Sequence, residues 1–338
     1  MNKNFNPIDK GHLLSMNALF SLINNHFFKS IINPFFAFLF PAIFVAILGM
    51  MLGYSALLGG LIAIPSMTIA LFVLPFTIFE FKSSVLLKRI AVTNIKPWMF
   101  LFAMITYYFA IVIVSTIITI LLSMALFSEY WTKGELISPA TNGAATPDGS
   151  PAGPPLIYAP SLQEYFMNAS WGGIIWGVIM NSLIGSSIGF LVVSFAKSSL
   201  ILQGVLLPIL ILSQFLSAMV LPISMVKSID AIWALTYASP FRYSTGLINE
   251  SFNGNILPMD SWAPAILNSA GKFEQTVLIE SSSIFDVNWG FSVLVTMQAG
   301  ELQPIFDQTD KILNLVMPFV ISGIFMGISL KTFKWSTR

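Results

Sequence analysis

Long apolar runs alternate with shorter polar segments along most of this chain. Six of the runs are long enough to cross the roughly 30 Å hydrocarbon core of a membrane as α-helices. They cover about residues 33–53, 56–79, 99–127, 172–194, 199–221 and 312–330. The pattern predicts an all-α integral membrane protein with six transmembrane helices.

Several residues inside these runs shape the helices that we expect. Prolines are tolerated in membrane helices where neighbouring helices satisfy the freed carbonyl groups, so Pro41, Pro65, Pro75 and Pro208 predict kinks. Three glycine pairs spaced by four residues allow close helix approach. They are Gly49 and Gly53, Gly173 and Gly177, and Gly185 and Gly189.

Residues 11–32 have the period of an amphipathic helix, because apolar residues recur at steps of three and four. The apolar positions are Leu13, Met16, Phe20, Ile23, Phe27 and Ile31. Such a helix ahead of a membrane span lies in the membrane interface. The alternative is that it packs on the protein itself.

Composition agrees with a lipid-embedded chain, since 56% of its residues are hydrophobic and 9% are charged. Cytoplasmic loops carry an excess of lysine and arginine. Six spans with both termini in the cytoplasm place eleven of the 16 basic residues inside: Lys3, Lys10, Lys29, Lys82, Lys88, Arg89, Lys96, Lys197, Lys331, Lys334 and Arg338. We therefore expect cytoplasmic N- and C-termini.

Two loops then face outward. Loop 128–171 contains a stretch rich in proline and small residues, 138–155, which we expect to be flexible because it cannot bury a core. Loop 222–311 is longer, and its first part is too polar to span and too apolar for a plain loop. We expect a re-entrant segment there, broken at Pro240, followed by a small cap of mixed structure over 254–310.

The segment 80–98 is an inner loop with an unusual mixture of residues. It is basic, yet Val85, Leu86, Arg89, Ile90 and Thr93 share one side of a helix by steps of three and four. Such a side fits the groove of a soluble partner. The alternative is an ordinary basic loop that only fixes the topology.

Motifs for catalysis or cofactor binding are missing from the sequence. It has no P-loop, no pair of histidines with metal-ligand spacing and no cysteine, and the expected spans hold no ionisable residue beyond Glu80 at an inner end. We expect no catalytic, cofactor or metal site, and no nucleic-acid partner. The polar residues inside the spans either join helices by hydrogen bonds or line a polar path: Thr68, Thr106, Ser115, Thr116, Thr119, Asn181, Ser182, Gln203, Gln214 and Asn314.

Two segments, 80–98 and the one around Pro240, resemble the permease subunits of type-2 ATP-binding-cassette (ABC) exporters. That family has an acidic residue at the end of the second span, a short cytoplasmic helix with a basic pair, and a proline-aromatic entry to the third span. Glu80, Lys88-Arg89 and Pro97-Trp98 occupy these places. The outer segment of the family ends in a proline-aromatic-tyrosine motif, which Pro240, Phe241 and Tyr243 match.

The apolar runs, the charges and the resemblance together give a domain plan. Residues 1–32 form a cytoplasmic tail and interface helix, 33–127 form spans one to three with a coupling helix at about 82–95, and 172–221 form spans four and five. Residues 128–171 and 222–311 are extracellular, and 312–338 form span six and a cytoplasmic tail. The family's contact with its ATPase falls on Val85, Leu86, Lys88, Arg89, Ile90, Thr93 and, in the next inner loop, Lys197.

The function implied is that of a transport subunit without an ATPase site of its own. Separate nucleotide-binding subunits carry ATP and Mg, and a second permease copy or a relative completes the pathway through the lipid. We expect a multi-pass protein of a bacterial plasma membrane that moves an amphipathic, lipid-like or drug-like cargo outward. The alternatives are a non-transporting scaffold or receptor with an extracellular cap, and a carrier without a motor, which the lack of buried carboxylates disfavours.

Overall fold

The computed structural model contains six helical stretches that are long and apolar enough to cross a membrane. They are Ile32–Met51, Leu57–Ser83, Phe102–Leu126, Trp171–Phe195, Ser199–Leu216 and Thr309–Ser329. This architecture is compatible with a multi-pass membrane protein, as the apolar pattern predicts. The structure describes residues 7–52, 54–84, 97–132, 136–139, 156–158, 161–221, 223, 226, 229–253, 295–298, 301–304, 306 and 308–332.

Helices make up most of the described chain. In order they are α1 (Pro7–Lys29), α2 (Ile32–Pro34), α3 (Phe40–Leu52), α4 (Tyr54–Thr68), α5 (Leu74–Ser83), α7 (Pro97–Leu126), α8 (Leu162–Asn168), α9 (Trp171–Phe195), α10 (Ser199–Leu216), α12 (Asp230–Thr236), α13 (Arg242–Asn253) and α15 (Gln308–Thr332). Short 3₁₀ and π turns cover Ser128–Tyr130, Phe35–Leu39 and Ile69–Val73.

Two short antiparallel hairpins lie in the segments that connect the helices. Strand β1 (Leu136–Pro139) pairs with β2 (Leu156–Tyr158), and β3 (Val295–Gln298) pairs with β4 (Glu301–Pro304). Residues 140–155, most of the stretch that we expect to be flexible, lie outside the described residues. So does 254–294, the larger part of the expected cap.

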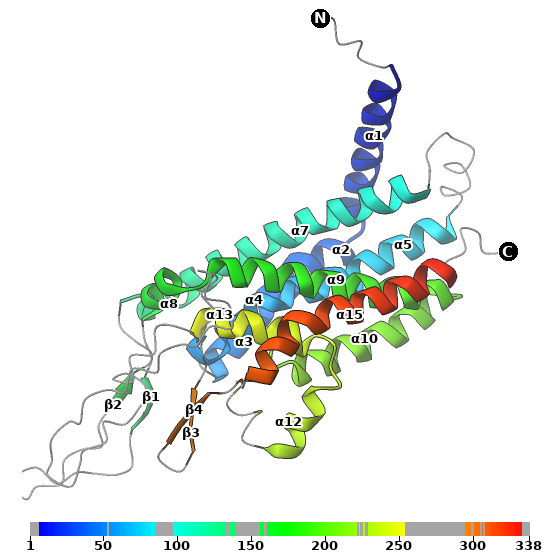
Figure 1. Cartoon of the computed structure of the whole chain (residues 1–338). Helices are drawn as coiled ribbons and strands as arrows, with labels where there is room; N and C mark the ends of the chain where they lie inside the picture. Colours follow the sequence, from blue (N-terminus) through cyan, green and yellow to red (C-terminus); the bar gives the residue numbers. More distant parts are fainter. Residues whose placement is uncertain are drawn as a thin grey trace, which may run out of the picture.

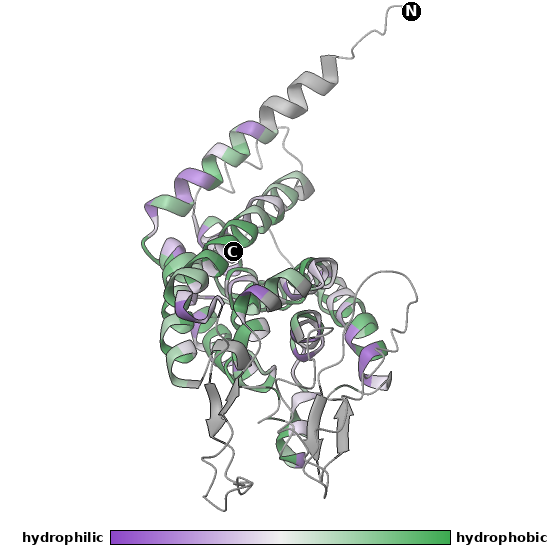
Figure 2. Ribbon diagram, turned by 90° about the vertical axis from the view of Figure 1, so that its left-hand side faces the viewer, coloured by the Kyte–Doolittle hydropathy of each residue, from purple (hydrophilic) through white to green (hydrophobic). Residues whose placement is uncertain are grey.

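The second span, made of α4, a π turn and α5, is the centre of the bundle. Its apolar window is buried throughout, and α3, α7, α9 and α10 all pack against it. Helix α15 packs along α9 at the periphery of the bundle (Figure 1). Hydrophobic residues predominate along the packed helices, while hydrophilic ones occur on α1 (Figure 2).

Each of the two π turns is followed by a proline two residues after it ends. Pro41 follows Phe35–Leu39, and Pro75 follows Ile69–Val73. A proline ring clashes with the carbonyl four residues earlier and cannot donate to it, and a wider turn relieves that clash. The carbonyl freed by Pro41 belongs to Ala37, and it accepts a hydrogen bond from the Ser115 hydroxyl of α7. A neighbouring helix therefore supplies the hydrogen-bond donor for the carbonyl that Pro41 frees, as the sequence predicts.

Glycines of α9 let it approach the second span closely. A Cβ on Gly185 would lie 2.9 Å from the Cβ of Ala70, and one on Gly189 would lie 2.1 Å from the Cγ of Pro75. These two glycines form one of the predicted four-residue pairs. Their contacts lie within the chain, so the pair joins α9 to the second span.

The C-terminal half of α1 packs on the bundle. Leu19, Ile23 and Phe27 are buried in the common core, and α7 lies beside them. Of these, Ile23 and Phe27 are predicted on the apolar face and Leu19 is not, while the predicted Ile31 lies beyond the end of α1 and is 87% exposed. The C-terminal half of α1 therefore packs on the protein, and its place in the membrane interface stays a prediction.

Candidate functional site

The C-terminal end of α5 is fastened to its neighbours by polar contacts. His26 Nε2 of α1 lies 3.3 Å from Glu80 Oε2, and its ring lies 4.5 Å from that of Phe81. Nearby, Tyr107 of α7 donates to Asn24 Oδ1 of α1 at 2.9 Å. Partial burial lowers the pKa of His26, and its contact with Glu80 is an ion pair only when the imidazole is protonated.

Lys82 joins the same end of α5 to α9. Its Nζ donates to the carbonyl of Val193 at 3.1 Å, and its side chain is almost fully buried. Val193 lies in the last turn of α9, where carbonyl groups lack helical donors and favour a cation. The end of α5 is therefore tied to α1 on one side and to α9 on the other.

Most residues of the predicted ATPase contact lie outside the described residues. These are Val85, Leu86, Lys88, Arg89, Ile90 and Thr93. The remaining one, Lys197, is exposed in the short link between α9 and α10. Since Lys82 contacts the last turn of α9, the structure brings Lys197 to the same end of the bundle as the start of the coupling helix predicted at about 82–95.

The proline-aromatic-tyrosine motif lies between α12 and α13. Phe241 and Tyr243 are buried, and the Tyr243 hydroxyl donates to the Tyr237 carbonyl at 3.1 Å. Burial raises the pKa of Tyr243, with Arg242 opposing that rise. The motif reverses the chain, so that α13 turns back and packs against α4, α9 and α15.

The end of α10 supports this reversal. Ala218, just after α10, has a left-handed φ of 54°, which ends the helix earlier than the predicted 221. The carbonyls of Ala218 and Met219 then lie against α4, where a Cβ on Gly60 would come within 2.8 Å and 2.5 Å of them. Ser217 and Ser239 share a 2.8 Å hydroxyl hydrogen bond, which links this turn to the motif.

Arg242 is the charged centre of the motif. Its Nη2 lies 2.9 Å from Asp310 Oδ1 of α15, and its Nε donates to Thr236 Oγ1 at 2.8 Å. The guanidinium carbon lies 3.7 Å from the ring centroid of Tyr237 and 4.6 Å from that of Trp233. An arginine held by a carboxylate and aromatic faces is suited to burial, because its fork and flat face are both used.

A second buried pair joins α13 to α15. Lys311 Nζ lies 3.5 Å from Glu250 Oε1, and Glu250 is 1% exposed. Burial raises the pKa of Glu250 to about 7, although Lys311 opposes the rise. Two ionisable pairs therefore lie between α13 and the first turn of α15.

These pairs are not predicted from the sequence, because their residues fall in the outward-facing loop 222–311, where charged side chains are expected in water. Glu250 and Asp310 are instead buried in helices. A signal was present in the sequence. Helix α13 carries apolar residues at Leu247, Ile248 and Phe252, and the pair Asp310-Lys311 comes directly before an apolar span.

Two asparagines inside the spans differ in their hydrogen bonding. Asn181 of α9 acts as a joint, since it donates to Ala63 O and Ser66 Oγ of α4 and accepts from Ser244 of α13. Asn314 of α15 is fully buried, and its side-chain atoms have no hydrogen-bond partner among the described residues. Both of the predicted roles, a helix joint and a polar path, therefore stay open for this set.

The described residues contain no group of three histidine, aspartate or glutamate side chains that could hold a metal ion. Comparison of the chain with protein-family models, with curated proteins and with solved structures gives no match.

Proposed function

We propose that the chain is the membrane-spanning permease subunit of an ABC exporter, driven by ATP that a separate subunit hydrolyses. The cargo is an amphipathic, lipid-like or drug-like molecule, moved outward across a bacterial plasma membrane. Both termini lie in the cytoplasm, and α12 with α13 forms the outer re-entrant segment. A second copy of the chain, or a relative, completes the pathway.

The observation that carries the proposal is the placement of two motifs at opposite ends of one bundle. The end of α5, where the basic segment begins, lies at the end of the bundle where α9 stops and α15 stops (Figure 1). The motif around Pro240 lies at the other end, beside the first turn of α15. An exporter needs this separation, because its motor and its outlet are on opposite sides of the membrane.

The contacts at the end of α5 supply a route for force. Closure of two ATPase subunits on ATP displaces the segment 85–93, because ATP makes different contacts in the open and closed states of the partner. Glu80 and Lys82 pass that displacement to α1 and α9. Since Gly185 and Gly189 hold α9 tightly on the second span, the helices move together as a body.

The test is purification of the tagged chain from its native membrane with its bound ATPase, followed by measurement of ATP turnover. Arg89→Glu and Ile90→Asp should each lower the amount of bound ATPase and the turnover at least tenfold, or about 1.4 kcal/mol. The controls Lys133→Glu and Ile229→Asp introduce the same acidic residues in the two loops predicted to face outward, and should leave both readouts unchanged.

Turnover that survives both Arg89→Glu and Ile90→Asp would contradict the coupling role. A scaffold or receptor predicts a different result, in which the wild-type chain brings down no ATPase subunit at all.

A further inference from the structure

We propose that a crevice between the second span, α7 and α9 binds the distal part of one acyl chain of a membrane phospholipid. The crevice has a volume of about 60 Å³. Its floor includes Ala70 and Leu74 of the second span and Tyr108 of α7, all of them buried. This site is separate from the proposed transport function and does not depend on it.

The walls of the crevice are almost entirely apolar. Three polar side chains line the crevice, and each hydroxyl is already bonded within the protein. Ser182 donates to Val178 O at 2.8 Å, Ser186 donates to Leu183 O at 3.1 Å, and Tyr108 shares a 2.6 Å hydrogen bond with Thr77. An apolar cavity of this kind excludes water, so an occupant must be a hydrocarbon.

The depth of the crevice identifies which part of a lipid reaches it. Ala70 is ten residues before Glu80 along the second span, which is about 15 Å at 1.5 Å per residue. That is half of the hydrocarbon thickness, so the crevice lies near the bilayer midplane, where acyl chains end. Headgroups cannot reach this depth.

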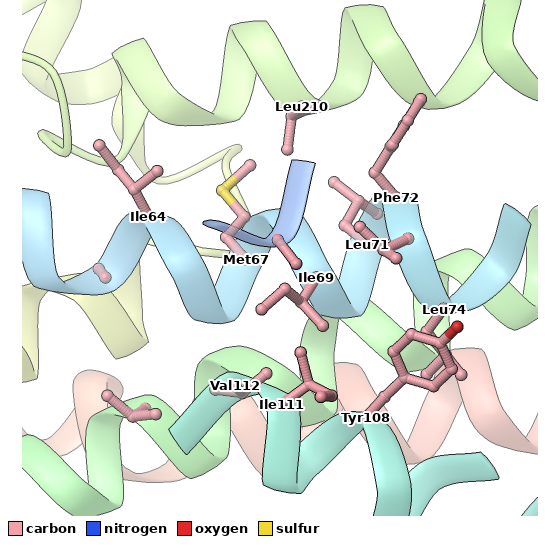
Figure 3. Packing of buried hydrophobic residues seen from close by; sticks show 14 of the residues in the cluster. Ile64, Met67, Ile69, Leu71, Phe72, Leu74, Tyr108, Ile111, Val112 and Leu210 are labelled. Carbon is pink, nitrogen blue, oxygen red and sulfur yellow. The ribbon is translucent and has the colours of Figure 1, made fainter. Parts of the chain in front are cut away.

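The crevice opens between α7 and α9. Ile105, Phe109 and Ile179 are half-buried at its edge, and Leu183 is 36% exposed. Below them, Ala70, Ser182 and Ser186 are small, and this leaves the space. In Figure 3, Leu74 lies beside Tyr108, and Leu210 of α10 lies across the second span from α7. Because the residues at the edge are partly exposed and those of the floor are buried, the opening faces lipid and the floor faces the core.

The experiment uses the purified full chain in phosphatidylcholine vesicles that contain a phosphatidylcholine with a diazirine near the end of one acyl chain. Photolysis and mass spectrometry then map the labelled residues. We expect label on the buried floor at Ala70 and Tyr108, and on the exposed Ile117 of α7, but none on the buried Ile62, which lies away from the crevice. A probe with its diazirine beside the headgroup should leave the floor unlabelled.

Filling variants test whether the label reports the crevice. Ser182→Leu and Ala70→Val should each reduce floor labelling at least fivefold, with labelling of Ile117 unchanged. The control Ser194→Leu changes another α9 serine that bonds its own helix, at Phe190 O, and should leave floor labelling as in the wild type. A wild-type floor that stays unlabelled would overturn the proposal. So would floor labelling that persists in both filling variants.

Discussion

Arg242 and Asp310 form a buried ion pair between the start of α13 and the first turn of α15, with 2.9 Å between Nη2 and Oδ1. Both side chains are about 95% or more buried, at 3% and 5% exposed. The Tyr237 hydroxyl donates to the same Oδ1 at 2.7 Å. This relationship fixes the reversed segment to the last span.

Removal of one partner of this pair should be strongly destabilising, because the other charge is then buried without compensation. Asp310→Asn or Arg242→Met should cost about 3–5 kcal/mol, measured as a lower melting temperature in detergent. The double variant Arg242→Met with Asp310→Asn should cost less than the sum of the two single changes. Asp230→Asn, an exposed acid at the start of α12, serves as the control and should cost under about 1 kcal/mol. Strictly additive losses would argue against the pair.

Ser115 and Pro41 should be coupled through the Ala37 carbonyl. Ser115→Ala leaves that buried carbonyl without a donor and should cost about 1–3 kcal/mol. With Pro41→Ala already present, residue 41 regains an N–H for the carbonyl, so the same change should cost much less. Thr116→Val is the matched control, because the hydroxyl of Thr116 is buried and has no partner among the described residues. Equal losses from Ser115→Ala in both backgrounds would refute the coupling.

Close packing between α9 and the second span predicts different outcomes for two glycines. Gly189→Ala forces a Cβ against the rigid ring of Pro75 and should destabilise the chain by about 1–3 kcal/mol. Gly204→Ala meets nothing within 4 Å and should be neutral or stabilising by up to about 1 kcal/mol. Comparison of the two melting temperatures checks this, and equal effects would contradict the packing.

Glu250 should make stability fall as pH rises. Its pKa is about 7 in the folded chain and 4.5 ordinarily, so between these values the folded state holds a proton that the unfolded state releases. The resulting loss between pH 4.5 and pH 7 is about 3 kcal/mol at most, at 1.36 kcal/mol per pH unit. Glu250→Gln should flatten the decline in melting temperature between pH 5 and pH 7.5. The control Glu129→Gln, at an exposed position, should leave that decline as in the wild type. A decline that is also unchanged in Glu250→Gln would show that Glu250 is not the titrating group.

The sequence predicts the spans well, because six long apolar runs leave little choice to a chain in lipid. It also predicts that a neighbouring helix satisfies the carbonyl freed by a proline, as Ser115 does. It does not predict which hydroxyl does so, because the donor is 78 residues away from Ala37.

The buried charges are harder to predict for a related physical reason. A carboxylate such as Glu250 is expected in water unless a partner is known, and its partner Lys311 is 61 residues away along the chain. Only the reversal of the chain at Pro240 brings α13 beside α15. The predicted coupling helix at about 82–95 differs from both, since its role is predicted from the sequence while most of its residues lie outside the described part of the chain.

The sidedness of α5 is the most direct test of a permease driven from the cytoplasm. The chain has no cysteine, so Ser84→Cys and Ile229→Cys each provide a single thiol, both at exposed positions. In intact cells, a membrane-impermeant maleimide should label Ile229→Cys and should label Ser84→Cys only after the membrane is opened. Labelling of Ser84→Cys in intact cells would place the start of the coupling segment outside and contradict the account.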